Sequence, residues 1–151
     1  MTLAIENLRK TLNEKGYEFE TMRREVAALD EELGQVSERI SSFENAKLSL
    51  TTFKNTKEND ELIVPVGEGV FIKTKLMKND EVMIGVGSNV VLTKDIDSAI
   101  AYIDARIDEA DNIIQTLNNN LAYFNQRLMQ LENEIQQIMN VLKSEESKGQ
   151  K

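Results

Sequence analysis

The sequence predicts an α+β fold: a long antiparallel two-helix coiled coil with two central β-hairpins that form an oligomerisation platform. The prediction follows from two seven-residue repeats of apolar residues, one in each half of the chain, and from a short stretch of alternating apolar residues between them. A strict repeat with steps of three and four places a narrow apolar seam on a helix and predicts left-handed supercoiling. The two repeats have nearly equal lengths, so the helices can fold back and pair.

The first helix is expected over residues 1–53, where Gly16 and Gly34 are the only glycines and proline is absent. Gly16 is expected to soften this helix by about 1 kcal/mol relative to alanine. Lys15 and Lys47 are the only polar members of the seam, and we expect them to fix register or mark local opening. The seam positions are Ile5, Leu8, Leu12, Lys15, Phe19, Met22, Val26, Leu29, Leu33, Val36, Ile40, Phe43, Lys47 and Leu50.

The middle of the chain, residues 61–94, has the period-two alternation of four short strands, most simply two β-hairpins. Gly67-Glu68-Gly69 and Gly87-Ser88-Asn89 are the expected hairpin turns, and Lys78-Asn79-Asp80 is expected to turn the chain between the hairpins. Proline cannot donate to a ladder of hydrogen bonds, so Pro65 indicates an edge strand or a position that faces away from the ladder.

These strands carry more apolar surface than two isolated hairpins can bury. Strand edges that stay exposed also invite pairing with other chains. We therefore expect an assembly platform built into a larger barrel or sandwich, and the alternative is that the hairpins only cap the coiled coil. The predicted assembly residues are Leu62, Val64, Val66, Val70, Ile72, Leu76, Val82, Ile84, Val86, Val90 and Leu92.

The second helix is expected over residues 95–142. Thr93 or Asp95 can cap it, and Asp95 with Asp97 complements the positive end of the helix dipole. Residues 143–151 are polar and lack the repeat, so we expect a disordered tail. The seam positions are Ile96, Ile100, Ile103, Ile107, Ala110, Ile114, Leu117, Leu121, Phe124, Leu128, Leu131, Ile135, Ile138 and Leu142.

At the free end of the paired helices, apolar side chains depart from the seam. Apolar residues outside a seam make an exposed adhesive surface, and methionine adapts to many shapes. The alternative is ordinary fraying with a few stray apolar residues. The off-seam residues are Leu3, Ala4, Met129, Met139 and Val141.

Composition excludes most catalytic classes. The chain has no cysteine and no histidine, so disulfides, thiolate chemistry and the commonest metal ligand are absent. Its net charge of −8 disfavours nucleic acid and anionic membranes as partners. We read the carboxylates at Asp104, Asp108, Glu109 and Asp111 as a solvated helix face and Gly85-Val86-Gly87 as a hairpin turn. No metal, no cofactor, no membrane span and no enzymatic activity are expected, and the predicted location is cytoplasmic.

The central segment resembles that of prefoldin alpha subunits of the archaeal type. The resemblance lies in residues 64–76 (VPVGEGVFIKTKL), residues 80–90 (DEVMIGVGSNV) and the start of the second helix at residues 95–100 (DIDSAI). The layout of long helix, two hairpins and long helix covers essentially the whole chain, and the two hairpins point to the alpha type because beta-type subunits have one.

The resemblance implies a hexamer of two alpha and four beta-type subunits that holds unfolded proteins without ATP and delivers them to a group II chaperonin. It also implies that clients bind at the coiled-coil tips. Two-hairpin relatives include proteins that assemble alone into filaments, so a structural filament is the alternative function. The client-binding candidates are the off-seam Leu3, Met129, Met139 and Val141, with Ile5, Leu8, Ile135 and Ile138 if the tip frays open.

Overall fold

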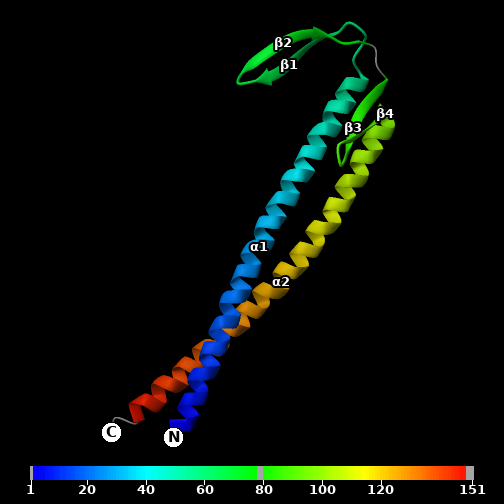
Figure 1. The fold of residues 1–151 in the computed structure, drawn as a ribbon. Coiled ribbons are helices and arrows are strands. Elements are labelled where there is room, and N and C mark those ends of the chain that lie inside the picture. Colours follow the sequence, from blue (N-terminus) through cyan, green and yellow to red (C-terminus); the bar gives the residue numbers. More distant parts are fainter. Residues whose placement is uncertain (1, 78–79, 149–151) are drawn as a thin grey trace. The chain divides into compact units, whose positions relative to one another are not determined.

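The computed structural model describes residues 2–77 and 80–148 and contains two long helices and two β-hairpins (Figure 1). The chain divides into two compact units. The terminal unit comprises Met1–Ser37 and Asn112–Lys151, and the hairpin unit comprises Glu38–Asp111. The elements are α1 (Thr2–Lys54), β1 (Glu61–Gly67), β2 (Val70–Lys75), β3 (Glu81–Gly87), β4 (Val90–Asp95) and α2 (Ile96–Lys148).

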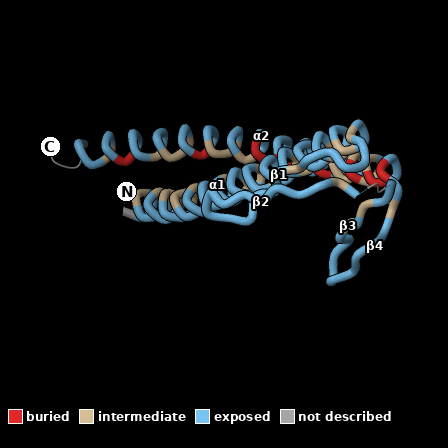
Figure 2. Tube along the Cα trace, turned by 90° about the horizontal axis from the view of Figure 1, so that it is seen from above, coloured by how far each residue is buried: buried red, intermediate tan, exposed pale blue. Residues whose placement is uncertain are grey.

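Within each unit α1 and α2 lie antiparallel, as the seam predicts. Arg9 binds Glu146 at 2.9 Å in the terminal unit, and Lys54 binds Asp97 at 2.5 Å in the hairpin unit. Every predicted seam residue is half-buried or buried. The buried positions recur along α2 (Figure 2), and of the eight buried apolar residues in the described part of the chain only Ala99 is not a seam position. The narrow-seam prediction is therefore confirmed.

The start of α2 is fixed by Asp95. Its Oδ1 accepts a hydrogen bond of 2.8 Å from the backbone N–H of Ser98, and its Oδ2 accepts one of 2.6 Å from the Ser98 hydroxyl. These two bonds hold the pKa of the Asp95 carboxyl below its ordinary value, with the side-chain bond as the main cause. Asp95 is thus the N-cap, as one of the two predicted candidates.

The helix continues through Lys148, so the predicted disordered tail is wrong for residues 143–148. Leu142 is buried in the seam, and Glu146 binds Arg9 of the other helix, so contacts with α1 extend beyond the apolar repeat. Residues 143–148 also contain neither glycine nor proline, and nothing in the sequence stops the helix there. Residues 149–151 lie outside the described residues.

The two hairpins are close copies of each other, twenty residues apart. In the first, Glu61 pairs with Lys75 and Val64 with Ile72; in the second, Glu81 pairs with Asp95 and Ile84 with Leu92. Both ladders have an irregularity just before the turn, between Pro65 and Gly67 and between Gly85 and Gly87. Pro65 therefore stands beside a bulge, where a missing donor is tolerated.

The tight turns lie at Glu68–Gly69 and Ser88–Asn89. All four residues have positive φ, at 47°, 76°, 50° and 58°. This is the pattern of a type I′ turn, whose twist suits two antiparallel strands. The Gly67-Glu68-Gly69 and Gly87-Ser88-Asn89 predictions are confirmed, but Gly85 and Val86 belong to β3, so reading Gly85-Val86-Gly87 as a turn is wrong.

The base of the first hairpin is tied to the loop that follows α1. Asn59 donates to the carbonyl oxygen of Leu76 at 2.8 Å, and the Leu76 N–H donates to the carbonyl oxygen of Asp60 at 2.9 Å. Leu76 therefore lies just beyond β2 and is half-buried at this base, not in the strand as its alternation predicted. Of the predicted turn at 78–80, residues 78–79 lie outside the described part of the chain.

Candidate functional site

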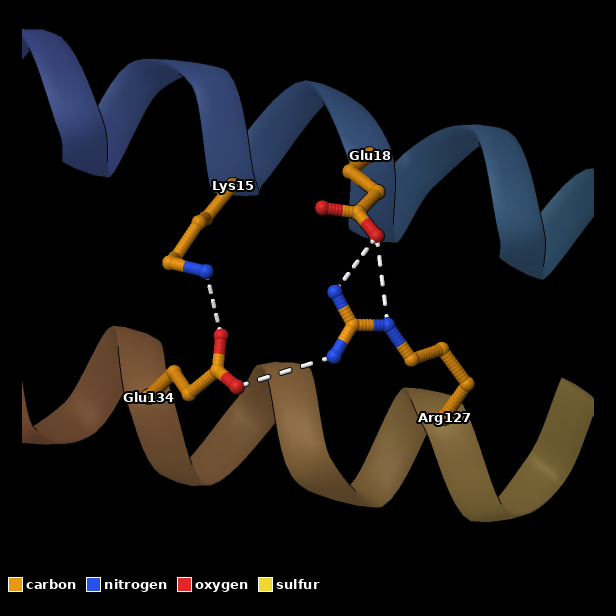
Figure 3. A network of polar contacts seen from close by, with 4 residues as sticks. All are labelled: Lys15, Glu18, Arg127 and Glu134. Atoms are coloured by element: carbon orange, nitrogen blue, oxygen red, sulfur yellow. Dashed lines mark hydrogen bonds and ion pairs between the residues drawn. The ribbon is translucent and has the colours of Figure 1, made fainter.

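A polar network joins the two helices of the terminal unit, where Lys15 takes a seam position (Figure 3). Lys15 Nζ binds Glu134 Oε2. Arg127 donates to Glu18 Oε1 from Nε at 3.2 Å and from Nη2 at 2.8 Å, and its Nη1 lies 3.6 Å from Glu134 Oε1. Each helix contributes one cation and one carboxylate.

The electrostatics of this network favour its charged form. The hydrogen bond from Lys15 holds the pKa of the Glu134 carboxyl below its ordinary value, and the charges of Lys15 and Arg127 add to that effect. The hydrogen bond to Glu18 raises the pKa of the Arg127 guanidinium. A shift of either helix along the other would separate these pairs, so the network specifies the register of the terminal unit.

The second seam lysine has the same kind of partner. In the hairpin unit, Lys47 Nζ lies 2.6 Å from Asp104 Oδ1. Both seam lysines thus bind a carboxylate of α2, and neither lies in a site that could desolvate an amine for catalysis. Each pair forms across the seam and restricts sliding of the helices.

The off-seam apolar candidates of the terminal unit are exposed. Leu3 is 76% exposed and Met129 is 67% exposed, and Met139 and Val141 are exposed to a smaller extent. The seam candidates Ile5, Leu8, Ile135 and Ile138 are instead half-buried between the helices. The exposed candidates are therefore accessible to another molecule while the helices are paired. The seam candidates would become accessible only if the helices separated.

The exposed candidates lie at separate positions on the two helices of the terminal unit. Met139 and Val141 lie within one turn of α2, and Met129 precedes Met139 by about 15 Å along the axis. Sequence reasoning missed Tyr17 and Tyr123, which are 78% and 64% exposed on the same unit. Their off-seam positions were the available signal, because an aromatic residue outside a seam has no helix partner to cover it.

Except for Leu76, which lies beyond β2, the predicted assembly residues share one face of each ladder, and most of that face is exposed. The exposed members are Val64, Val66, Val70, Ile72, Val86, Val90 and Leu92. Leu62, Val82 and Ile84 are half-buried. The exposure indicates that the apolar face is largely uncovered in the single chain.

The opposite face of each hairpin is also apolar, which sequence reasoning missed. Ile63 and Phe71 are 66% and 61% exposed on the first hairpin, and Met83 and Val91 are exposed on the second. The signal was present as unbroken apolar runs, such as residues 62–66 and 90–92, which are typical of strands covered on both faces.

A groove of 830 Å³ lies between β3 and the helices of the hairpin unit. Its helical side includes Phe43, Leu50 and Ile103, and its strand side includes Val82 and Ile84. Arg39 and Arg106 also line it. This arrangement suits an apolar partner that carries an acidic group.

The described residues contain no group of acidic side chains suited to a metal ion. Of the predicted solvated carboxylates, Asp104 binds Lys47 and Glu109 binds Arg106. Over residues 2–77 and 80–148, neither helix has a stretch apolar enough to span a membrane.

Comparisons of this sequence with known proteins all identify the same protein family. The family model described as "Prefoldin subunit" matches residues 22–141. The prefoldin subunit alpha of Thermococcus onnurineus is 30% identical over 99 residues, which cover 65% of this chain and 67% of that protein. The prefoldin subunit alpha of Thermofilum pendens is 22% identical over 104 residues, covering 69% and 81%.

One solved structure has a similar fold. A chain in the cryo-EM structure of filamentous PFD from Methanocaldococcus jannaschii aligns with a TM-score of 0.69 and 22% sequence identity. The alignment covers 77% of this chain and 96% of that chain.

Proposed function

Because the chain belongs to the prefoldin family of chaperone subunits and has the two-hairpin layout of the alpha type, we propose that it is a subunit of an ATP-independent holdase. In this proposal it captures unfolded proteins with the terminal unit and passes them to a group II chaperonin. The family is one of chaperones and not of enzymes. The observation that carries the proposal is the exposure of Leu3, Met129, Met139 and Val141 outside the seam.

The proposed mechanism is multivalent weak capture. A few exposed apolar side chains on one subunit bind little alone. Several subunits that grip one unfolded chain multiply the avidity through effective concentration. Release then needs a competing partner and not nucleotide hydrolysis. Methionine suits this use because its flexible, polarisable side chain adapts to different clients.

Assembly is assigned to the hairpins. The uncovered apolar faces, from Val64 and Ile72 on the first hairpin to Val90 and Leu92 on the second, support a platform shared with other prefoldin subunits. We propose that these partners include beta-type subunits, in a hexamer of two alpha and four beta chains. The acidic net charge of −8 keeps such an assembly soluble while it holds adhesive clients.

Removal of both tips tests the capture mechanism. A chain that begins at Phe19 and ends at Gln126 lacks the client-binding candidates but keeps both hairpins. We expect it to assemble with beta-type subunits and to lose suppression of client aggregation. Unchanged suppression by the truncated assembly would refute capture at the tips.

A structural filament is the second candidate function. The hairpins expose apolar residues on both faces, Ile63 and Phe71 as well as Val64 and Ile72, and such a hairpin can contact chains on two sides. The solved structure with a similar fold is described as filamentous. Sizing the chain alone and mixed with a beta-type subunit separates the two: a defined hexamer supports the chaperone, and open-ended fibres support the filament.

A further inference from the structure

The groove between β3 and the helices of the hairpin unit has the size and the lining of a small-molecule site. Its volume of 830 Å³ lies within the range of about 300–1,000 Å³ that is typical of such sites. Phe43, Leu50 and Ile103 form apolar wall on the helical side, and Val82 and Ile84 form it on the strand side. Val82 and Ile84 are half-buried, unlike most of the apolar face of the hairpins.

The positive charge of the groove lies toward one end. Along α1, Leu50 and Arg39 are separated by about 17 Å, and both line the groove. Lys47 and Asp104 pair across the two helices and fix their alignment beside the groove. Because the helices are antiparallel, Arg106 of α2 lies past Asp104 in the direction of Arg39. The two arginines that line the groove therefore lie toward the end opposite Leu50.

These arginines are available to an external anion. The lining contains no carboxylate, in a chain with a net charge of −8. Arg106 pairs with Glu109, which is exposed and lies outside the lining. In the described part of the chain, Arg39 has no carboxylate partner, and its guanidinium carbon lies 6.0 Å from the ring centre of Phe43. A guanidinium beside an apolar surface is well suited to bind a carboxylate through two hydrogen bonds.

We propose that the groove binds a long-chain carboxylate, which is the chemistry of a fatty acid. The carboxylate binds Arg39 and Arg106, and the hydrocarbon chain lies along the apolar walls toward Leu50. One charged end and one long apolar part match an amphiphile with a single acidic head group. The inference goes beyond the proposed function, because the client-binding candidates lie in the terminal unit and this groove lies in the hairpin unit.

Isothermal titration calorimetry of the full chain with dodecanoate, below its micellar concentration, tests the proposal. We expect saturable binding of one dodecanoate per chain. Octanoate should bind about tenfold more weakly or worse, because each buried methylene contributes roughly fourfold in affinity. Dodecanol should also bind about tenfold more weakly or worse, because it lacks the charge that the arginines bind.

Removal of the two positive charges tests the head-group site. The double variant Arg39→Gln/Arg106→Gln should bind dodecanoate about tenfold more weakly or worse and should lose the preference for dodecanoate over dodecanol. Arg24→Gln is the matched control, because Arg24 is an exposed arginine of α1 that does not line the groove. It should bind dodecanoate like the unchanged chain.

A bulky side chain in the groove tests the site of the hydrocarbon chain. Ala46 is exposed and lines the groove, so Ala46→Trp should fill part of it and abolish binding of dodecanoate and dodecanol alike. Ala28→Trp is the matched control. Ala28 is an exposed alanine directly before seam residue Leu29, as Ala46 is directly before Lys47, and it lies outside the groove. This control should leave binding unchanged.

A fluorescent reporter locates the bound molecule independently of affinity. The chain has no tryptophan, so Tyr102→Trp places a single indole in the lining of the groove. Dodecanoate should shift the emission of this reporter. It should not shift the emission of Tyr123→Trp, which places the indole at an exposed position of the terminal unit.

The proposal is overturned if dodecanoate does not bind, if the double arginine variant binds it as tightly as the unchanged chain, or if Ala46→Trp still binds it. Two other occupants give different results, and each would also overturn it. Arginine-dependent binding to phosphatidylglycerol vesicles, without binding of dodecanoate, would assign the groove to a membrane surface. Loss of self-association in Ala46→Trp, measured by sedimentation velocity and again without binding of dodecanoate, would assign it to a second copy.

Discussion

Among the described residues of the terminal unit, Leu131 is the fully buried side chain, and its truncation gives a measurable prediction. It is a seam residue that lies between Arg127 and Glu134 in the sequence, and its relative exposure is 0%. Leucine-to-alanine changes in protein cores cost about 3–5 kcal/mol, from lost transfer free energy and from the cavity that remains. The neighbouring seam residues Leu128 and Ile135 are only half-buried and can relax, so we expect Leu131→Ala to cost about 3 kcal/mol, at the lower end of that range.

Thermal and urea unfolding followed by circular dichroism measure this cost. For a chain of this size we expect the midpoint temperature to fall by about 6–12 °C. Leu48→Ala is the matched control, because Leu48 is 66% exposed and the same truncation should cost less than about 0.5 kcal/mol. Equal costs for the two variants would refute the assignment of the seam as the core of the paired helices.

Two further predictions concern the terminal unit. Gly16→Ala and Gly34→Ala should each stabilise α1 by about 1 kcal/mol, because a Cβ at either position meets open space. Gly16 lies in the tip and Gly34 lies outside it, so if tip opening aids capture, only Gly16→Ala should reduce suppression of client aggregation. Equal suppression of aggregation by the two variants would contradict that link. Because the pKa of Glu134 is lowered in the folded state, its contribution to stability is fully present above the ordinary value of 4.5 and is lost as pH falls through the folded-state pKa. Glu134→Gln should therefore reduce the loss of stability on acidification. An unchanged loss of stability on acidification, measured by hydrogen exchange, would rule out this contribution.

The sequence was sufficient to predict the helices, because few structures other than paired helices give an apolar repeat of seven residues. Every seam position, including Lys15 and Lys47, is at least half-buried. The repeat could not show where α2 ends, since the ion pair between Glu146 and Arg9 extends the contact past Leu142. A polar segment with a partner on the opposite helix resembles a disordered tail when only its composition is considered.

The hairpins show a different limit of sequence reasoning. The alternating apolar pattern predicts one apolar face on each hairpin, which includes Val64 and Ile72. It does not predict the second apolar face, with Ile63 and Phe71. The groove lined by Arg39 and Arg106 depends on residues more than sixty positions apart, and no local pattern predicts it. Its positive charge becomes visible only when α1 and α2 are placed beside β3.

Site-specific photo-cross-linking tests the central claim, that clients bind at the exposed off-seam residues of the terminal unit. A photo-reactive amino acid is placed at Met129 or Met139, and at exposed Leu48 as the control, and the assembled chaperone is mixed with a chemically unfolded protein. The account predicts strong cross-links from Met129 and Met139 and few from Leu48. Cross-links from Leu48 as strong as those from the two methionines would contradict it.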